Sequence, residues 1–418
     1  MSAMSDAFAL RNPTEAEFPR FIAPLSIAFN QELSDAAIEN DRKTIELDRF
    51  VGALEGDDVV GCGGAYTFGL TVPGGEVGAA GITAVGVLPS HRRRGILRQM
   101  MTWLFAQARE RGEPVAILWA SEAAIYQRFG FGMGTIQTSL EMARDKVRFL
   151  RPVEPPGRIR IVDLDAAVER FPPVYDAVRR STPGSITRTQ ARWRYETLAD
   201  GEWMRYGNGA KIRAVYEVDG DARGYAIYRT RGDWDHGGPK GVVTVLEVCA
   251  LDAVVEQAIW EWIVGIDLIA TIRAWRGPSP HPLQLMVTEP RRLGATLTDG
   301  TWLRILDLPA ALEARAYRRS GSLIFDVTDA ECPWNAGRWR LSVEADGAAG
   351  STSVRSASES VVPDLALDIG DLAAVYLGAF RVADLAGVGR VRECRPGAVA
   401  AADDLFVTAR APSNGTMF

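Results

Sequence analysis

The 418-residue sequence has few of the side chains that metal and redox sites require. It contains three histidines, and none of them is spaced to share a metal ion with another ligand. Its four cysteines lie far apart and form no Cys-x-x-Cys pair, which favours reduced thiols. We therefore expect neither a metal site nor a disulfide framework, and a histidine is not favoured as a catalytic base.

Long apolar runs and an excess of basic residues are also missing. No stretch approaches the roughly 20 apolar residues that a membrane span needs. Residues 1–20 carry several charges in place of the apolar segment of a signal peptide. The net charge of −6 disfavours nucleic acid as the main partner and is compatible with a cationic substrate. We expect a cytoplasmic protein without a nucleic-acid or membrane partner.

Two common phosphate-binding motifs are absent as well. There is no Gly-Lys-Ser/Thr of a Walker loop and no Gly-x-Gly-x-x-Gly of the dinucleotide-binding folds. In their place, a predicted strand from Ile82 to Leu88 ends at Pro89 and is followed by three consecutive arginines. A helix is then expected from just after Gly95 to about Arg109, because apolar residues recur there at a spacing of three and four. These residues are Leu97, Met100, Met101, Leu104 and Phe105.

This strand, turn and helix are suited to a ligand that carries a diphosphate. The first turn of a helix has unpaired N–H groups and a partial positive charge, and both favour a phosphate. The arginines add charge and paired N–H donors, and Gly95 leaves the backbone open to close approach. Three arginines before a glycine are by themselves more often a solvated turn. The predicted site therefore depends on the whole stretch.

The flanking sequence predicts a mixed α/β order. Three glycines within one of the early predicted strands indicate a bulge or a close approach of backbones. The run from Pro114 to Trp119 is wholly apolar, which is typical of a buried parallel strand. A helix is expected to start at Ser121, and a strand from Thr135 to Met142 is expected to close this first domain. A further strand from Trp302 to Leu308 is expected to open the last domain.

Several of these segments resemble one known family. The pattern Arg92-x-x-Gly95-x-Leu97 is similar to the acyl-CoA pyrophosphate loop of the GNAT acetyltransferases, although most of them have glycine or alanine at the last position. The longer string from Val85 to Arg98 resembles the version in the enhanced-intracellular-survival (Eis) N-acetyltransferases, where leucine is usual there. Four more segments agree in the same order along the chain. They are residues 120–132, 224–229, 302–317 and 376–381.

The resemblance implies an α/β (α+β) protein with two GNAT-like domains in tandem, followed by a domain like the sterol carrier proteins. We place the acetyl-CoA-binding domain at residues 1–150, the second GNAT-like domain at 151–296 and the third domain at 297–418. The proline-rich segment 151–157 supports the first boundary. In the second domain, Leu251-Asp252-Ala253 stands where the first has its basic glycine turn, so we expect no second cofactor there. The third domain is expected to be a scaffold rather than a lipid carrier.

The implied cosubstrate is acetyl-CoA, without a metal. The positions that match the family's acetyl-CoA contacts are Val85, Gly86, Val87, Arg92, Arg93, Arg94, Gly95, Ile96, Leu97, Arg98, Ser121 and Glu122. Backbone N–H groups at a bulge beside Val85–Val87 are expected to stabilise the oxyanion that forms at the thioester carbonyl. For the acceptor amine, we expect contacts with Ala84, Trp119 and Phe29.

The resemblance also implies two catalytic residues. Tyr126 matches the family's general acid, and a tyrosine with an ordinary pKa of about 10 stays protonated and can donate to a leaving thiolate. The proton acceptor of the family is the terminal carboxylate of the chain, which here belongs to Phe418. A free terminal carboxylate has a pKa of about 3.5, and partial burial would raise that pKa.

These expectations describe an acetyl-CoA-dependent N-acetyltransferase of polycationic amines such as aminoglycosides, acting at several positions and so linked to antibiotic resistance. The family implies a homohexamer. Two alternatives stay open at this point. One is an N-acetyltransferase of protein lysines, and the other is a noncatalytic lipid-binding or scaffold protein.

Overall fold

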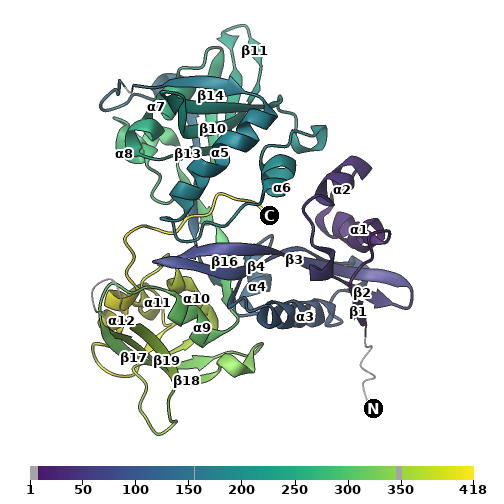
Figure 1. The fold of residues 1–418 in the computed structure, drawn as a ribbon, viewed down its shortest axis with the longest axis vertical. Coiled ribbons are helices and arrows are strands. Elements are labelled where there is room, and N and C mark those ends of the chain that lie inside the picture. The colour runs from purple at the N-terminus through teal and green to yellow at the C-terminus, as the bar shows by residue number, and fades with distance from the viewer. Residues whose placement is uncertain (1–7, 155, 345–350) are drawn as a thin grey trace. The chain divides into compact units, whose positions relative to one another are not determined.

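The computed structural model describes residues 8–154, 156–344 and 351–418. They form two compact units, drawn as ribbons in Figure 1. The first unit contains the described residues up to Gly134, those of Thr301–Thr408, and Met417–Phe418. The second contains those of Thr135–Gly300, and Ala409–Thr416. Within these described ranges, no helix has the length and apolar character to cross a membrane.

The first unit is built on a seven-stranded sheet. Its spatial order is β1 (Ala9–Arg11), β2 (Phe50–Glu55), β3 (Asp58–Val72), β4 (Gly75–Val87), β5 (Val115–Trp119), β16 (Thr301–Ile305) and β6 (Gly132–Met133). Neighbouring strands are antiparallel except β4 and β5. β5 is buried except at Trp119, which confirms the parallel strand expected from its wholly apolar sequence.

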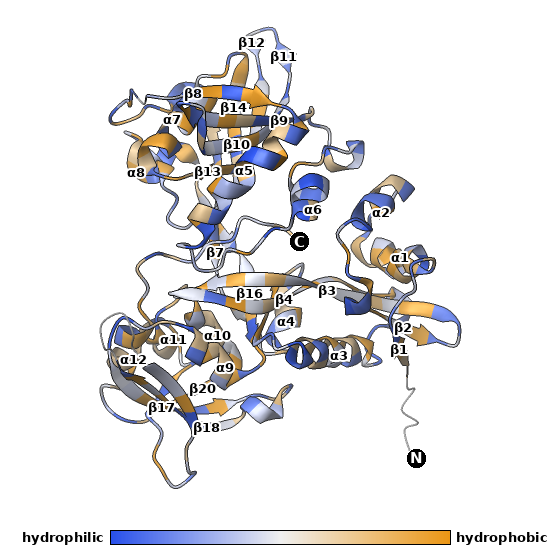
Figure 2. Ribbon diagram, viewed as in Figure 1, coloured by the Kyte–Doolittle hydropathy of each residue, from blue (hydrophilic) through white to orange (hydrophobic). Residues whose placement is uncertain are grey.

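Four helices from the described part of the first 134 residues accompany this sheet, and the third confirms the predicted amphipathic helix. They are α1 (Phe18–Phe29), α2 (Asp35–Asp41), α3 (Ile96–Glu110) and α4 (Ala123–Gln127). Figure 2 shows that α3 mixes apolar and polar residues along its length. Its predicted apolar stripe is buried at Met100, Met101, Leu104 and Phe105, while Leu97 is only partly buried.

β4 and β5 separate part-way along their length. They pair only from Ala79 and Val115 to Gly81 and Ile117, although both strands continue beyond these residues. Close to the same point β4 has one residue more than β3, because Thr83 pairs with Gly64 while Gly86 pairs with Cys62. This is a β-bulge, and it confirms the irregularity expected at the glycines of β3. The backbone of Ala84, within the bulge, has a φ of 53°.

Two predicted strands belong to other sheets than expected. The strand expected to close the first domain is β7 (Ile136–Ala143), and it pairs with β14 (Ile269–Gly277) and β15 (Thr296–Asp299) in the second unit. The strand expected to open the last domain is β16, which completes the first sheet between β5 and β6. Both assignments were wrong because the local pattern of a strand does not encode its distant partner. The domain boundaries themselves stay a prediction.

The second unit repeats the arrangement of a mixed sheet with helices. Its seven strands are, in spatial order, β15, β7, β14, β13 (Gly241–Ala250), β10 (Asp221–Arg231), β9 (Lys211–Val218) and β8 (Arg158–Val162). Its helices are α5 (Leu164–Arg179), α6 (Gln190–Arg192), α7 (Ala253–Val264) and α8 (Leu283–Met286), and a small hairpin is formed by β11 (Trp234–Asp235) and β12 (Gly238–Pro239). β13 and β14 are parallel, and their pairing ends at Val245 and Ala274.

A third sheet completes the first unit. Its order is β19 (Ser351–Ser356), β18 (Gly337–Glu344), β17 (Gly321–Thr328), β20 (Leu365–Asp368) and β21 (Arg392–Glu393), with helices α9 (Leu308–Ala314), α10 (Ile369–Tyr376), α11 (Val382–Gly387) and α12 (Ala398–Phe406). α10 lies close to β6, since a Cβ on Gly132 would clash with the carbonyl oxygen of Gly370. The buried guanidinium of Arg304, on β16, pairs with Asp329 at 2.6 Å.

Candidate active site

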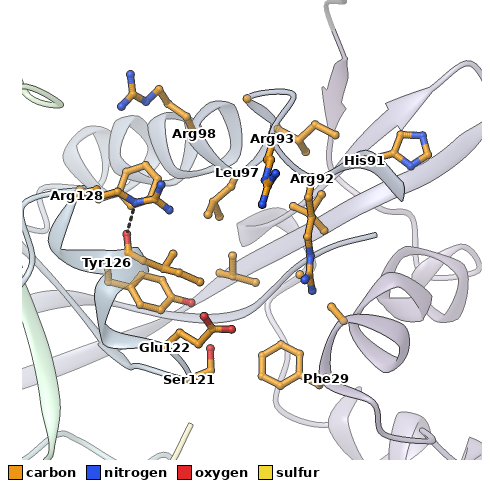
Figure 3. A pocket seen from close by; sticks show the side chains of 18 of the residues that line it. Phe29, His91, Arg92, Arg93, Leu97, Arg98, Ser121, Glu122, Tyr126 and Arg128 are labelled. Atoms are coloured by element: carbon orange, nitrogen blue, oxygen red, sulfur yellow. Dashed lines mark hydrogen bonds between the residues drawn. The ribbon is translucent and has the colours of Figure 1, made fainter. Parts of the chain in front are cut away.

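A cavity of about 800 Å³ lies in the first unit, beyond the point where β4 and β5 separate. Four segments line it: the end of α1, the last residues of β4, the turn into α3 with its first residues, and the region around α4 (Figure 3). The lining residues are Ala28, Phe29, Asn30, Val85, Gly86, Val87, His91, Arg92, Arg93, Gly95, Ile96, Leu97, Arg98, Ser121, Glu122, Ile125, Tyr126, Arg128 and Phe129.

Most residues predicted from the sequence are brought together around this cavity. Among the expected acetyl-CoA contacts, all except Arg94 belong to the lining, and so do Tyr126 and Phe29. Ala84, Trp119 and Phe418 are not among the lining residues. Ala84 directly precedes the lining residue Val85, and Trp119 lies two residues before the lining residue Ser121. Both are therefore near the cavity along the chain, although neither is part of its wall.

The arginines of the motif point in different directions. In Figure 3 the side chains of Arg92 and Arg93 reach into the space above Phe29 and Glu122, whereas Arg98 points away from Tyr126. Arg98 pairs instead with Glu331 at 3.1 Å.

Arg94 is directed to a different part of the first unit. Its guanidinium pairs with Glu55 at 2.7 Å and lies 4.8 Å from the centroid of the Phe8 ring. The sequence could not separate it from Arg92 and Arg93, because all three are adjacent in a turn and only the folded backbone assigns each a direction.

The start of α3 has the geometry of an anion site. The residue before the helix is Gly95, whose φ of 84° lies in the left-handed region that glycine adopts readily. Glycine has no side chain to cap the first N–H groups, and no atom lies within 4 Å of the position that a Cβ would occupy. The first-turn N–H groups and the positive end of the helix dipole are therefore open toward the cavity.

Tyr126 lies opposite this helix start, on α4. Its side chain is only 6% exposed and packs edge-on against Phe131, with ring centroids 6.0 Å apart. Burial raises the pKa of its hydroxyl, and this outweighs a hydrogen bond with Ser121 that lowers the pKa. Because the pKa lies above its ordinary value, the hydroxyl stays protonated across the neutral range and can act as a proton donor.

The ring of Phe418 is held against the sheet of the first unit. Its centroid lies 5.0 Å from that of Phe68, on β3, with the two rings inclined at 64°. On β4, a Cβ at Gly81 would lie 3.2 Å from the Phe418 ring, so the absence of a side chain there makes room for it. Gly81 is also the last residue of β4 that pairs with β5. The terminal residue thus packs where the two strands begin to separate.

Sequence reasoning missed several lining residues. They are Ala28, Asn30, His91, Ile125, Arg128 and Phe129. His91 and Arg128 stand inside segments that carry the family resemblance, so the motif could have indicated them. Asn30 ends α1 with a φ of 52°, a conformation that asparagine tolerates. That signal predicts the end of a helix but not the cavity beside it.

Family models agree with the three-part organisation. A model described as an acetyltransferase (GNAT) domain matches residues 9–134, and a second GNAT model matches residues 184–305. A model of the sterol carrier protein domain matches residues 308–414. The expected order of two GNAT domains and a sterol-carrier-like domain is confirmed.

Whole-chain relatives identify the family within GNAT. The chain is 40% identical to an uncharacterized N-acetyltransferase of Streptomyces avermitilis over 88% of both chains. It is 33% identical to the N-acetyltransferase Eis of Mycobacterium tuberculosis over 92% of both chains. The crystal structure of Eis1 from Mycobacterium abscessus is 32% identical and superposes with a TM-score of 0.82, covering 98% of this chain and 100% of that one. The chain belongs to the Eis family of GNAT N-acetyltransferases.

Membership of the Eis family makes the protein an N-acetyltransferase, and the GNAT fold implies the use of acetyl-CoA. The residues present fit that cosubstrate. An open helix start beside two arginines suits a diphosphate, and the open space at Gly95 leaves room for it. The strand that borders the cavity is free of its parallel partner at Val85–Val87, so its edge can pair with an extended ligand.

Proposed function

We propose that the protein transfers an acetyl group from acetyl-CoA to primary amines of polycationic small molecules such as aminoglycosides, at several positions. The observation that carries this proposal is the single cavity wall that runs from the β4 bulge, through the open start of α3, to the buried Tyr126. Acetyl-CoA supplies a thioester, which is activated for attack by an amine. The protein has to bind its diphosphate, orient the thioester and move two protons.

Binding and orientation are assigned to the first half of the wall. The N–H groups at the start of α3, with Arg92 and Arg93, hold the negative diphosphate. Backbone N–H groups of Val85–Val87 stabilise the negative charge that develops on the carbonyl oxygen. The lost pairing of β4 beyond Gly81 is what frees these groups.

Proton transfer is assigned to two residues. Tyr126 donates a proton to the departing sulfur, which suits a hydroxyl whose pKa burial raises. The carboxylate of Phe418 accepts the proton that the attacking amine loses. The half-buried ring of Phe418 supports this role, because a ring fixed against Phe68 limits the motion of its own carboxylate.

The preference for polycations is tested by comparing acceptors. Purified protein is assayed with acetyl-CoA and either a kanamycin-type polyamine or a lysine peptide, and release of the CoA thiol is followed. We expect a higher kcat/KM for the polyamine, with more than one acetyl group per molecule by mass spectrometry. A higher kcat/KM for the lysine peptide would instead favour a protein acetyltransferase. Failure to bind acetyl-CoA in calorimetry would exclude both activities.

We further propose that the protein is a homohexamer, that it is linked to antibiotic resistance and that it is cytoplasmic, each because of its family. Sedimentation of the purified chain tests the first. A change in aminoglycoside susceptibility of cells that express the chain tests the second, and fractionation of those cells tests the third.

A further inference from the structure

The segment that precedes the terminal residue is built into the second unit. Residues 409–416 belong to that unit, although they follow the third domain in the sequence. The N–H of Ser413 donates to the carbonyl of Pro183 at 2.8 Å, and the Ser185 hydroxyl donates to the Ser413 carbonyl at 3.1 Å. Asn414 and Thr416 are buried. Both backbone and side-chain contacts therefore fix this segment on the second unit.

The strongest contacts are made by the hydroxyl of Thr416. Arg188 Nε and Nη2 donate to Thr416 Oγ1 at 3.0 and 2.7 Å. The Tyr175 hydroxyl lies 3.1 Å from the same oxygen and donates its own proton to the Ile186 carbonyl at 2.8 Å. A tyrosine hydroxyl has one proton, so the Thr416 hydroxyl donates to Tyr175 while it accepts from Arg188. Every hydrogen-bonding capacity of this hydroxyl is used.

Arg188 is itself fixed by a buried partner. Its guanidinium makes a bidentate ion pair with Glu247, with N–O distances of 3.0 and 2.8 Å. It also lies over the Tyr175 ring, 3.9 Å from the ring centroid. Burial alone would raise the pKa of Glu247, but the charge of Arg188 and the hydrogen bonds from Arg188 and Tyr225 together outweigh it, and the pKa is lowered. Tyr225 also donates to Glu247. The Arg188 guanidinium is thus already oriented to donate hydrogen bonds to the Thr416 hydroxyl.

Glu247 lies at the point of the second domain where its two parallel strands separate, which is a characteristic position in a GNAT domain. It lies on β13 two residues beyond Val245, where β13 and β14 stop pairing. In the first domain, the corresponding part of β4 borders the cavity. In the second domain, the same part of the strand holds an ion pair that binds the chain's own C-terminal segment.

We propose that Arg188, Glu247 and Tyr175 form an anchoring site for Thr416, and that this anchor positions the carboxylate of Phe418 for catalysis. The inference rests on the proposed role of that carboxylate. Two residues beyond a fixed Thr416, the chain can reach no further than about 7 Å. Within the first unit, the Phe418 ring packs on Phe68, which limits the motion of the terminal residue.

The test uses the full chain with a matched pair of substitutions. Thr416→Val keeps the shape of the side chain but removes the hydroxyl, and Thr416→Ser keeps the hydroxyl. Carboxypeptidase A removes aromatic C-terminal residues, so the rate of Phe418 release reports how firmly the terminus is held. We expect release from Thr416→Val to be about tenfold faster than from wild type, since hydrogen bonds to a charged group are lost. Thr416→Ser should release Phe418 at close to the wild-type rate.

Kinetics separate positioning from a general loss of structure. In Thr416→Val we expect kcat to fall while the KM for acetyl-CoA stays near wild type, and Thr416→Ser should recover kcat. Arg188→Lys is a second variant, because lysine keeps the charge but not the planar fork. It should release Phe418 faster than wild type. Thr298→Val, on exposed β15, controls for loss of a threonine hydroxyl elsewhere.

The release rate of Phe418 tests the anchoring of Thr416, whereas turnover tests the catalytic role of the terminal carboxylate. Wild-type rates of Phe418 release in both Thr416→Val and Arg188→Lys would overturn the anchor, whatever the activity. Faster release with unchanged kcat would leave a binding site for the segment but overturn its positioning role, and it would also contradict a catalytic carboxylate. Full turnover after deletion of Phe418 would overturn the catalytic carboxylate and with it the positioning role, and the release assay would still decide whether Arg188, Glu247 and Tyr175 anchor Thr416.

Discussion

The two GNAT domains share a pair of parallel strands that separate part-way along their length, but the side chains around the point of separation differ. In both, two parallel strands separate after a short paired segment, at Gly81 and Ile117 in the first and at Val245 and Ala274 in the second. In both, the central strand carries one extra residue near that point, and in the second domain this residue is Leu246. The fold alone therefore does not decide whether a domain binds acetyl-CoA.

The helix start that follows each central strand shows the difference. α3 begins after Gly95, which offers no side chain and leaves the first N–H groups open. α7 begins after Asp252, whose carboxylate accepts from the N–H of Val255 at 2.9 Å. A carboxylate at this position both satisfies the helix N-terminus and repels a phosphate. This supports the sequence-based expectation that the second domain lacks a phosphate loop.

The largest effect is expected from deletion of Phe418, because the new terminal carboxylate, on Met417, lies one residue short of the position that the first domain would use. Loss of a general base lowers kcat by about 10²–10⁴-fold, and acetyl-CoA binding should be retained because the α3 site is untouched. Single-turnover kinetics and calorimetry measure the two quantities. Phe418→Leu is the control, since it keeps a terminal carboxylate on an apolar side chain. Normal turnover of the deletion variant would exclude the terminal base.

In the second domain, the ion pair should matter for stability. Arg188→Met leaves Glu247 buried without its partner, which costs about 3–5 kcal/mol of the free energy of unfolding. Without Arg188 the pKa of Glu247 is raised by burial above its unfolded value, so the loss should shrink as the pH falls and grow as it rises. Urea denaturation at several pH values measures this. Arg188→Met combined with Glu247→Leu should recover part of the stability, and equal losses in both variants would contradict the explanation.

Tyr126→Phe tests the acid of the first domain. We expect kcat to fall by about 10²-fold, the lower range for a positioned proton donor, with unchanged acetyl-CoA affinity. Because burial raises the pKa of Tyr126, the alkaline fall in wild-type kcat from this group should lie above its ordinary value and should vanish in the variant. Rapid-quench kinetics across pH measure both. A wild-type chemical step in Tyr126→Phe would show that another group donates the proton.

The smallest effect should follow from exchanging the helix starts. Gly95→Asp places in the first domain the kind of residue that stands at Asp252 in the second. Gly95→Asn has the same size and tolerates positive φ equally well, but it carries no charge. Calorimetry should show acetyl-CoA binding about tenfold weaker for Asp than for Asn, through repulsion between the carboxylate and the diphosphate. Equal affinities would mean that the helix start does not bind the diphosphate.

Around the motif, the local sequence was enough to predict the secondary structure and the buried residues. The buried stripe of α3, the buried strand β5 and the glycine before α3 follow from periodicity, composition and the conformational freedom of glycine, which act within a few residues. The sequence also places Leu251-Asp252-Ala253 in the second domain where the first has its basic glycine turn, and the expectation of no phosphate loop there depends on this local difference. Each of these features depends on contacts with near neighbours along the chain.

Features that join distant segments were decided only by the tertiary structure. β7 and β16 looked like ordinary strands of their own domains, yet each pairs in another sheet. The sequence could not show that Arg94, unlike Arg92 and Arg93, points away from the cavity; only the structure shows that its guanidinium pairs with Glu55. The cluster of Arg188 and Glu247 around Thr416 has no signature in the sequence, because its members are about 60 and 170 residues apart and charge pairing over such separations requires the folded chain.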